Sequence, residues 1–431
     1  MAAEMLLQYL WEHRLIERSS LTTVDGERVV IIDPGLRNNN AGPDFFNAKI
    51  MIGERMWAGN VEIHVTASDW MRHRHHLDPA YDSVILHVVG ASDTSVSTSK
   101  GRVVPQMVMP YTPDYRTRYD AMVNDRSSRL PCASELMRID PIYISDWIMS
   151  LGLERLIDKA NRITDYLKRV DGDWQAAAYV TLARALGFSV NSEPFERLAL
   201  ATPLKVLLKH AGDHEMIEAA LFGQAGFIDC CAEPEADRIY AARLLQNYSF
   251  MCAKYGLNAP ESLAWRMARM RPPNFPQRRV AALSALICDG FKLGRNFAHV
   301  TDEASARALF EVKLSPFWSV HYNFGVQAVE SRTAFSHDTV TSLLINVIAP
   351  LMYAYGQEYG PDGCCERAVA LLESLHPESN SLVSIFTDIG VPCTDAYMSQ
   401  ALIQLRRQYC EPRKCLYCRI GHRILTARAK P

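Results

Sequence analysis

The sequence predicts an α/β domain with a mixed sheet over residues 1–130, followed by a mostly α-helical region over residues 131–431. Three observations predict this division. Short β-branched runs and a hairpin pattern fill the first part, helical periodicity begins near Pro141, and the polar segment 125–131 lies between them. A chain of 431 residues also exceeds the size of one usual hydrophobic core, so two domains are expected.

The composition is that of an ordinary globular protein, with 48% hydrophobic and 22% charged residues. The formal net charge of −2 singles out no partner. The chain lacks a run of about 18 apolar residues and the charged start of a signal peptide. Its 11 cysteines, an odd number, make a poor disulfide framework. We therefore expect a cytoplasmic protein without a membrane segment; its oligomeric state is left open.

The elements of the first domain follow from local patterns. Apolar residues at helical spacing predict a helix at the start, and β-branched or alternating runs bounded by turn residues predict strands. A helix between two strands also implies a crossover and a parallel pair. The expected elements are a helix over 5–11, a strand over 29–32, a hairpin of 45–52 and 56–66, a short helix over 68–76, and strands over 83–89 and 103–109.

The second region reads as helical because long segments rich in alanine and leucine replace the strand patterns. Examples are residues 176–186, 236–254 and 278–287. We expect a helical domain that ends in a cysteine-rich loop.

Acidic residues and a histidine gather on the predicted hairpin. Asp44 follows Pro43 at the start of one strand, and Glu62 and His64 alternate with apolar residues on the next, so both point to one face. Carboxylate oxygens are natural ligands of hard divalent cations. We predict that Asp44 and Glu62 bind Mg²⁺ or Mn²⁺. A turn followed by a solvated sheet face is the alternative.

This arrangement resembles the restriction-endonuclease-like superfamily, whose pattern is Pro-Asp, a spacer, and (Asp/Glu)-x-Lys on a core strand. Asp44 and Glu62 match the two acids, whereas His64 stands where lysine is usual. The resemblance implies a metal-dependent nuclease in which His64 positions the attacking water and Glu12 supplies an additional acid. The missing lysine leaves open a catalytically inactive nucleic-acid-binding protein on the same fold.

Three histidines follow within four positions, at 73, 75 and 76. Adjacent residues on a helix point about 100° apart, so at most two of them can bind one ion. We predict the i, i+3 pair His73 and His76. With His64 and Asp78 this pair suggests another metallohydrolase, acting on a small phosphorylated or amide substrate. A helix end that contacts the phosphate backbone is the alternative.

The whole chain also resembles an uncharacterised bacterial family of Bacteroidetes type, a domain of unknown function. The segments that carry this resemblance are GPDF, VEIHVTASDW, HLDPAYDSVILHVV, NSEPFERLA, LFGQAG and MRPPNFPQRR, with the cysteine-rich C-terminus. It implies no activity.

Three cysteines, Cys410, Cys415 and Cys418, lie within nine residues near the C-terminus. Closely spaced thiolates are typical of zinc sites and iron–sulfur clusters, here in a structural role. Candidates for the fourth ligand are His422, Cys393, Cys364 and Cys365. Incidental cysteines around a helix end are the alternative.

A basic stretch with aromatic neighbours leads into the third of the helical segments and includes its first two residues. Its arginines are Arg266, Arg269, Arg271, Arg278 and Arg279. Clustered arginines beside aromatic rings suit a nucleic-acid backbone and stacked bases, so nucleic acid is the expected partner. Solvated helix faces are the alternative.

Overall fold

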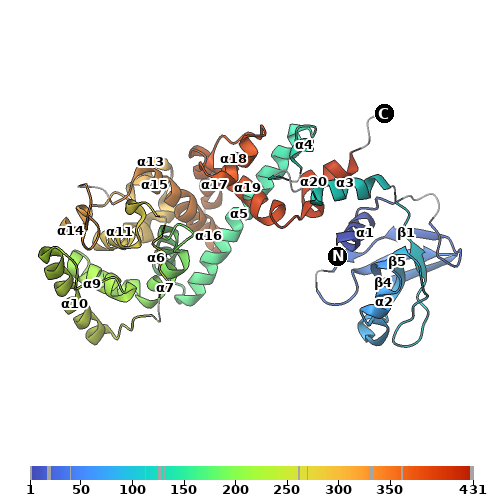
Figure 1. The fold of residues 1–431 in the computed structure, drawn as a ribbon, viewed down its shortest axis with the longest axis horizontal. Helices are drawn as coiled ribbons and strands as arrows, with labels where there is room; N and C mark the ends of the chain where they lie inside the picture. Colours follow the sequence, from blue (N-terminus) through green and yellow to red (C-terminus); the bar gives the residue numbers. More distant parts are fainter. Residues whose placement is uncertain are drawn as a thin grey trace. The chain divides into compact units, whose positions relative to one another are not determined.

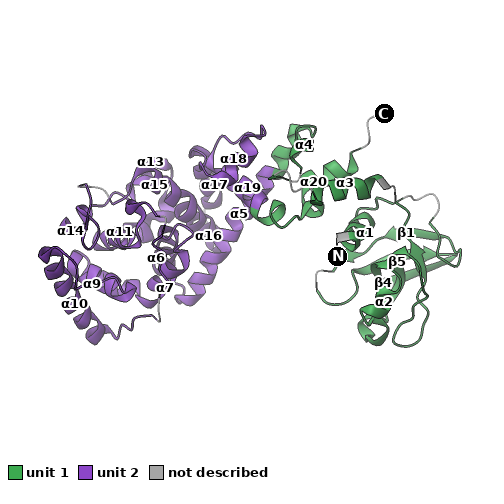
Figure 2. Cartoon of the chain, in the orientation of Figure 1, with its two compact units in different colours: residues 1–147, 407–431 green, residues 148–406 purple. Residues whose placement is uncertain are grey.

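The computed structural model describes residues 2–16, 21–38, 40–111, 113–124, 129–130, 132–260, 263–268, 270–329, 334–360 and 363–427. The chain divides into two compact units, residues 1–147 with 407–431 and residues 148–406 (Figures 1 and 2). The cysteine-rich segment is thus part of the first unit rather than of the helical one. Of the expected linker 125–131, residues 125–128 and 131 lie outside the described residues.

The first unit contains the sheet, the helices around it and the helical segments near its boundary. Its elements are α1 (Ala2–Glu12), β1 (Val29–Asp33), β2 (Leu36–Arg37), β3 (Phe45–Ile52), β4 (Arg55–Thr66), α2 (Asp69–Arg72), the 3₁₀ turns His75–Leu77 and Pro79–Tyr81, β5 (Val84–Ala91), β6 (Gln106–Val108), α3 (Pro113–Asn124), α4 (Ala133–Leu136), the first turns of α5 (Pro141–Arg169), the 3₁₀ turn Cys415–Tyr417 and α20 (Arg419–Thr426).

The sheet of this unit is mixed, as the sequence predicts. Its strand order is β1-β3-β4-β5-β6, and β2 pairs with β3. The strands β1, β3 and β4 run antiparallel, whereas β4, β5 and β6 run parallel. The predicted hairpin and the predicted parallel pair after the crossover are both confirmed. Strand β4 therefore lies in the middle of the sheet, between β3 and β5.

The centre of β4 is buried from Val61 to His64. Apolar packing explains Val61 and Ile63, which are both fully buried. Burial of Glu62 and His64, 5% and 1% exposed, is costly unless specific partners compensate. Gly59 allows β4 and β5 to approach, because a Cβ there would lie 2.7 Å from the Ser83 carbonyl oxygen and 2.4 Å from Ile85 Cγ2.

The second unit is helical, apart from one small hairpin, in the part that the structure describes. Its elements are the rest of α5, α6 (Trp174–Leu186), α7 (Ser192–Ala201), α8 (Leu204–Leu207), α9 (His214–Ala225), α10 (Glu235–Tyr255), α11 (Pro276–Cys288), α12 (Lys292–Asn296), α13 (Glu303–Ala308), α14 (Pro316–Ser319), β7 (His321–Asn323), β8 (Val326–Gln327), α15 (His337–Leu343), α16 (Ala349–Tyr359), α17 (Cys364–Ser374), α18 (Ser381–Thr387) and α19 (Ala396–Gln404).

One helical stretch, His337–Tyr359, is long and apolar enough to cross a membrane by composition. Within the described residues it is the one such stretch, and 78% of its apolar window is buried inside the protein. Its residues from Leu343 to Ala354 contribute to the main core of the helical unit. The stretch therefore has the surroundings of a core helix.

Candidate metal centre

Glu62 and His64 lie on the same face of β4, as strand alternation predicts. The parallel neighbour β5 places His87 in register with Glu62, and His87 is fully buried. His64 Nδ1 lies 2.9 Å from His87 Nε2. The sheet thus presents one carboxylate and two imidazoles in a buried row.

Two more histidines come from the segment after α2. The predicted helix through His76 is wrong, because α2 ends at Arg72 and Arg74 adopts a left-handed backbone with φ of 63°. A left-handed residue breaks the helical spacing, so His73 and His75 turn toward β4 together. The histidine that accompanies His73 is therefore His75, not His76. The only sequence signal for it is the histidine run itself.

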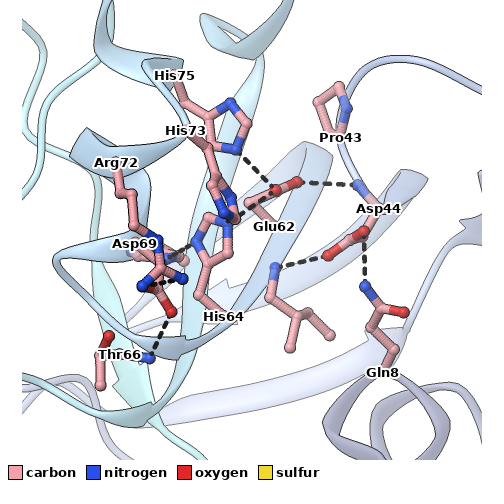
Figure 3. Close-up of polar contacts among 12 residues, drawn as sticks. Gln8, Pro43, Asp44, Glu62, His64, Thr66, Asp69, Arg72, His73 and His75 are labelled. Carbon is pink, nitrogen blue, oxygen red and sulfur yellow. Dashed lines mark hydrogen bonds and ion pairs between the residues drawn. The ribbon is translucent and has the colours of Figure 1, made fainter. Parts of the chain in front are cut away.

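The nitrogens of His64, His73 and His75 all lie within 4.8 Å of one another, the group of three potential ligands found among the described residues (Figure 3). His64 Nε2 is 3.1 Å from His73 Nδ1. Glu62 Oε1 is 3.4 Å from His64 Nε2 and 3.3 Å from His75 Nε2. Four tetrahedral ligands of zinc, each about 2.0–2.1 Å from the ion, lie about 3.3 Å apart. The separations of these atoms therefore fit one ion.

His75 has a buried ring nitrogen, Nε2, without a hydrogen-bond partner among the described residues. Glu62 Oε1 lies 3.3 Å away from it, at ion-pair distance. The ring itself is held firmly, stacked on Tyr81 at 3.8 Å between centroids and packed against the edge of Trp70. A buried polar nitrogen without a partner costs free energy. A metal ion placed between these atoms would remove that cost.

A second row of contacts can orient His64 for ligation. His87 Nδ1 lies 3.3 Å from the side-chain amide of Gln106 on β6. The Gln106 Nε2–H donates to His87 Nδ1, so His87 Nε2–H donates to His64 Nδ1. Ligation through His64 Nε2 requires the opposite tautomers, with the Gln106 amide turned so that its oxygen accepts from His87 Nδ1–H. Buried partners of this kind commonly fix the tautomer of a ligating histidine.

Asp44 lies on the other side of Glu62 from the histidines (Figure 3). Its backbone N–H donates to Glu62 Oε2 at 3.0 Å. Its own carboxylate accepts from the Gln8 side chain at 2.9 Å and from the Ile63 backbone N–H at 3.0 Å. Asp44 therefore positions Glu62 and ties α1 and β3 to β4. Its direct ligation of an ion stays a prediction.

Burial decides the charge states of this cluster. It raises the pKa of Glu62 to about 8 and, together with the nearby Glu62 carboxylate, that of Asp44 to about 7. Burial and the neighbouring histidines lower the pKa of His64 to about 2. His64 therefore stays neutral near pH 7, as a ligand must, and is poorly suited to act as a base. A divalent cation would supply the positive charge that two buried carboxylates lack.

The other residues predicted for this site lie outside the cluster. Glu12 forms an ion pair with Arg37 at 3.0 Å. Asp78 caps the turn Pro79–Tyr81 by accepting from the Ala80 N–H. His76 is partly buried, and its Nδ1 has no hydrogen-bond partner among the described residues.

The three C-terminal cysteines are buried, with Cys415 and Cys418 joined by a 3₁₀ turn. Cys393 belongs to the other unit, and His422 Nδ1 lies 2.6 Å from the Tyr9 hydroxyl. The sequence pattern does not reveal that Cys132 is near Cys418 and Cys415. Burial, and then these two thiols, raise the pKa of Cys132 to about 12. A metal at these cysteines stays a prediction.

The predicted arginine surface is only partly exposed. Arg278 and Arg279 lie on the buried helix α11, 7% and 5% exposed, and donate to the His321 carbonyl oxygen and to Asn274. Since these side chains hold the core together, they are not free to contact a phosphate backbone. Arg266 and Arg271 are exposed, whereas Arg269 lies outside the described residues.

Comparison with known proteins finds no match among curated proteins and none among solved structures. A family model does match residues 4–381, which span both units, and its description is "Protein of unknown function (DUF2851)". Because this match covers most of the sequence, the chain belongs to that family.

Proposed function

We propose that the first unit is a metal-dependent nuclease that hydrolyses phosphodiester bonds, with a metal ion held by Glu62, His64, His73 and His75. The observation that carries the proposal is the convergence of three imidazole nitrogens, all within 4.8 Å of one another, with Glu62 Oε1 within 3.4 Å of those of His64 and His75. These ligands combine buried carboxylate and imidazole groups, which gives the site both charge and directional lone pairs.

The order of elements supports a nuclease fold. A helix, an antiparallel hairpin, a short helix and a parallel strand occur in this order as α1, β3, β4, α2 and β5, with β1 and β2 between α1 and β3 and two 3₁₀ turns between α2 and β5. The restriction-endonuclease-like core uses this order, with Pro-Asp before one strand and the second acid on the next. Pro43-Asp44 precedes β3 and Glu62 lies on β4, so the resemblance extends from the motif to the topology.

The residues of the site have separate roles in this mechanism. A bound ion lowers the pKa of water and polarises a phosphoryl oxygen. Glu62 and the three histidines hold it, and Asp44 fixes the Glu62 carboxylate through its backbone N–H. His73 is exposed whereas Glu62 and His64 are buried, so a phosphodiester reaches the site from the His73 side.

Histidine ligands favour a transition metal over Mg²⁺. Imidazole suits zinc and similar ions, whereas Mg²⁺ prefers oxygen ligands and retains several waters. We therefore expect Zn²⁺ or Mn²⁺ to support activity better than Mg²⁺.

A metallohydrolase for another substrate is the second candidate. The observation that favours it is that three imidazoles, rather than a lysine, surround Glu62. The same cluster without hydrolysis would leave a nucleic-acid-binding protein.

A cleavage assay on single-stranded and duplex DNA and RNA with Zn²⁺, Mn²⁺ or Mg²⁺ separates the nuclease from the other two candidates. We expect the native protein to cleave and Glu62→Gln to lose at least about 100-fold in cleavage rate. The control Glu54→Gln, at an exposed glutamate in the turn of the same hairpin, should keep the native rate. Folded, metal-loaded protein that cleaves none of these substrates would contradict the nuclease and favour the other hydrolase or the binding protein.

A further inference from the structure

A cavity of about 840 Å³ opens in the first unit, separate from the metal cluster. Its walls come from α1, β2, the first turns of α5 and the segment that follows the C-terminal cysteines. The lining residues that matter here are Tyr9, His13, Arg37, Tyr143, Tyr417 and Arg423. None of them belongs to the ligand set above.

Flat rings and guanidinium groups alternate along this cavity. The Arg37 guanidinium lies 5.1 Å from the centroid of the Tyr417 ring, and that of Arg423 lies 3.5 Å from the Tyr143 ring. Tyr417 and Tyr143 are 46% and 41% exposed, although large aromatic side chains gain from burial. Aromatic rings and arginine planes are the surfaces on which unpaired nucleobases stack.

The charges of the lining favour an anion. Arg37 is neutralised by Glu12 at 3.0 Å and Arg419 by Asp146 at 2.5 Å. Arg423 forms no ion pair within the described residues, so its charge remains available. A phosphate group beside it would satisfy the guanidinium with charge-assisted hydrogen bonds.

One side chain connects this cavity to the metal centre. Arg37 Nη2 donates to Gln8 Oε1 at 2.9 Å, and Gln8 Nε2 donates to Asp44 Oδ1 at 2.9 Å. Gln8 thus lies between the cavity wall and the carboxylate that positions Glu62.

We propose that the cavity binds one nucleotide of a single-stranded nucleic acid, with its base stacked on Tyr417 or Tyr143 and its phosphate beside Arg423. The strand is single because only an unpaired base offers a free face for stacking. This inference rests on the proposed function for the identity of the ligand, but binding and cleavage are measured separately.

The test measures fluorescence anisotropy of a labelled twelve-nucleotide oligothymidine with the full-length Glu62→Gln protein, in which cleavage is lost while any metal at the C-terminal cysteines is kept. We expect Tyr417→Ala and Arg423→Ala each to raise Kd about 10-fold, since stacking on one aromatic residue contributes about 1–3 kcal/mol. Tyr417→Phe should leave Kd unchanged, because the ring face is kept. The matched control is Phe250→Ala in the other unit, whose ring is 50% exposed and also faces a cation, Lys254.

Unchanged Kd in both Tyr417→Ala and Arg423→Ala, with native melting temperatures, would overturn the inference even if the protein is an active nuclease. Competition by thymidine monophosphate as strong as by the oligonucleotide would also overturn it, because the pocket would then hold a free nucleotide. Strand binding that depends on Tyr417, while the native protein cleaves nothing, would support this inference and contradict the proposed function.

Discussion

The proposed metal centre consists mainly of single buried polar side chains. Glu62, His64 and His75 are each less than 10% exposed, and the nitrogen of His75 has no hydrogen-bond partner. Leaving a buried nitrogen such as His75 Nε2 without a partner costs about 1–3 kcal/mol. The adjacent His76 has the same side chain but lies outside the cluster. It therefore serves as a control that separates the effect of a histidine at the site from that of losing any histidine.

We predict that His75→Ala weakens Zn²⁺ binding by at least 10-fold, because it removes one of four converging ligand atoms, whereas His76→Ala changes it less than twofold. Calorimetric titration of the metal-free variants measures both. An equal loss of Zn²⁺ affinity in the two variants would mean that His75 is not a specific ligand of the metal.

Another buried acid, Glu218, lies in the helical unit. Glu218 on α9 is 1% exposed and accepts a hydrogen bond from the Tyr240 hydroxyl. Burial raises its pKa from 4.5 to about 7. The folded state therefore keeps its proton at a pH where the unfolded chain loses it. The stability contributed by this group is present below pH 4.5 and is lost as the pH rises toward 7.

Glu218→Gln should remove this pH dependence, since glutamine stays neutral. Relative to the native protein, the variant should gain about 1–3 kcal/mol in free energy of unfolding between pH 5 and pH 8. Urea unfolding at the two pH values measures the difference. If the difference in free energy of unfolding between the variant and the native protein is the same at pH 5 and pH 8, Glu218 does not ionise in this pH range.

At the scale of elements, periodicity predicts the parts of the site that lie on regular structure. Alternation along β4 places Glu62 and His64 on one face, and the crossover rule makes β4 and β5 parallel. It fails at Arg74, because a single left-handed residue replaces the helical spacing that favoured His76. It also fails on α11, where Arg278 and Arg279 are buried by elements far away in the sequence.

Contacts across long sequence separations are the other missing part. His87 and Gln106 complete the site only because β5 and β6 add in register beside β4. Cys132 approaches the C-terminal cysteines from almost 300 positions away. No local pattern encodes such pairings, which come from the packing of the whole unit.

Gly59 tests the element that positions the ligands. A Cβ at this residue would lie 2.7 Å from the Ser83 carbonyl oxygen and would separate β4 from β5. We expect Gly59→Ala to lower the free energy of unfolding by about 1–3 kcal/mol and to weaken metal binding. Thermal unfolding with and without Zn²⁺ measures both effects. Native stability in this variant would show that the strands tolerate the extra methyl group.

At the scale of the molecule, the last segment of the chain completes the first unit. Arg118 on α3 donates to the carbonyl oxygens of Ile424 and Leu425 at 3.4 and 3.3 Å, near the end of α20. Tyr9 on α1 contacts His422 on the same helix. Tyr9 and His422 also line the cavity beside Tyr417.

Arg118→Ala should therefore destabilise the first unit by about 1–2 kcal/mol, because it leaves helix-terminal carbonyls without a donor. The control is Arg116→Ala, whose more exposed side chain pairs with Asp120 on the same helix. Hydrogen exchange of α20 reads out the effect locally. Equal hydrogen-exchange protection of α20 in both variants would show that Arg118 does not stabilise this helix.

The central claim is that the first unit binds a metal through histidine and carboxylate ligands. X-ray absorption fine structure at the metal edge tests it most directly, because zinc–nitrogen or zinc–oxygen bonds are about 2.0–2.1 Å and zinc–sulfur bonds about 2.3 Å. We predict one metal ion per chain with a nitrogen and oxygen shell that disappears in His75→Ala, beside any sulfur shell from the cysteines. A protein whose only bound metal has sulfur ligands, or whose nitrogen shell survives in His75→Ala, would contradict the claim.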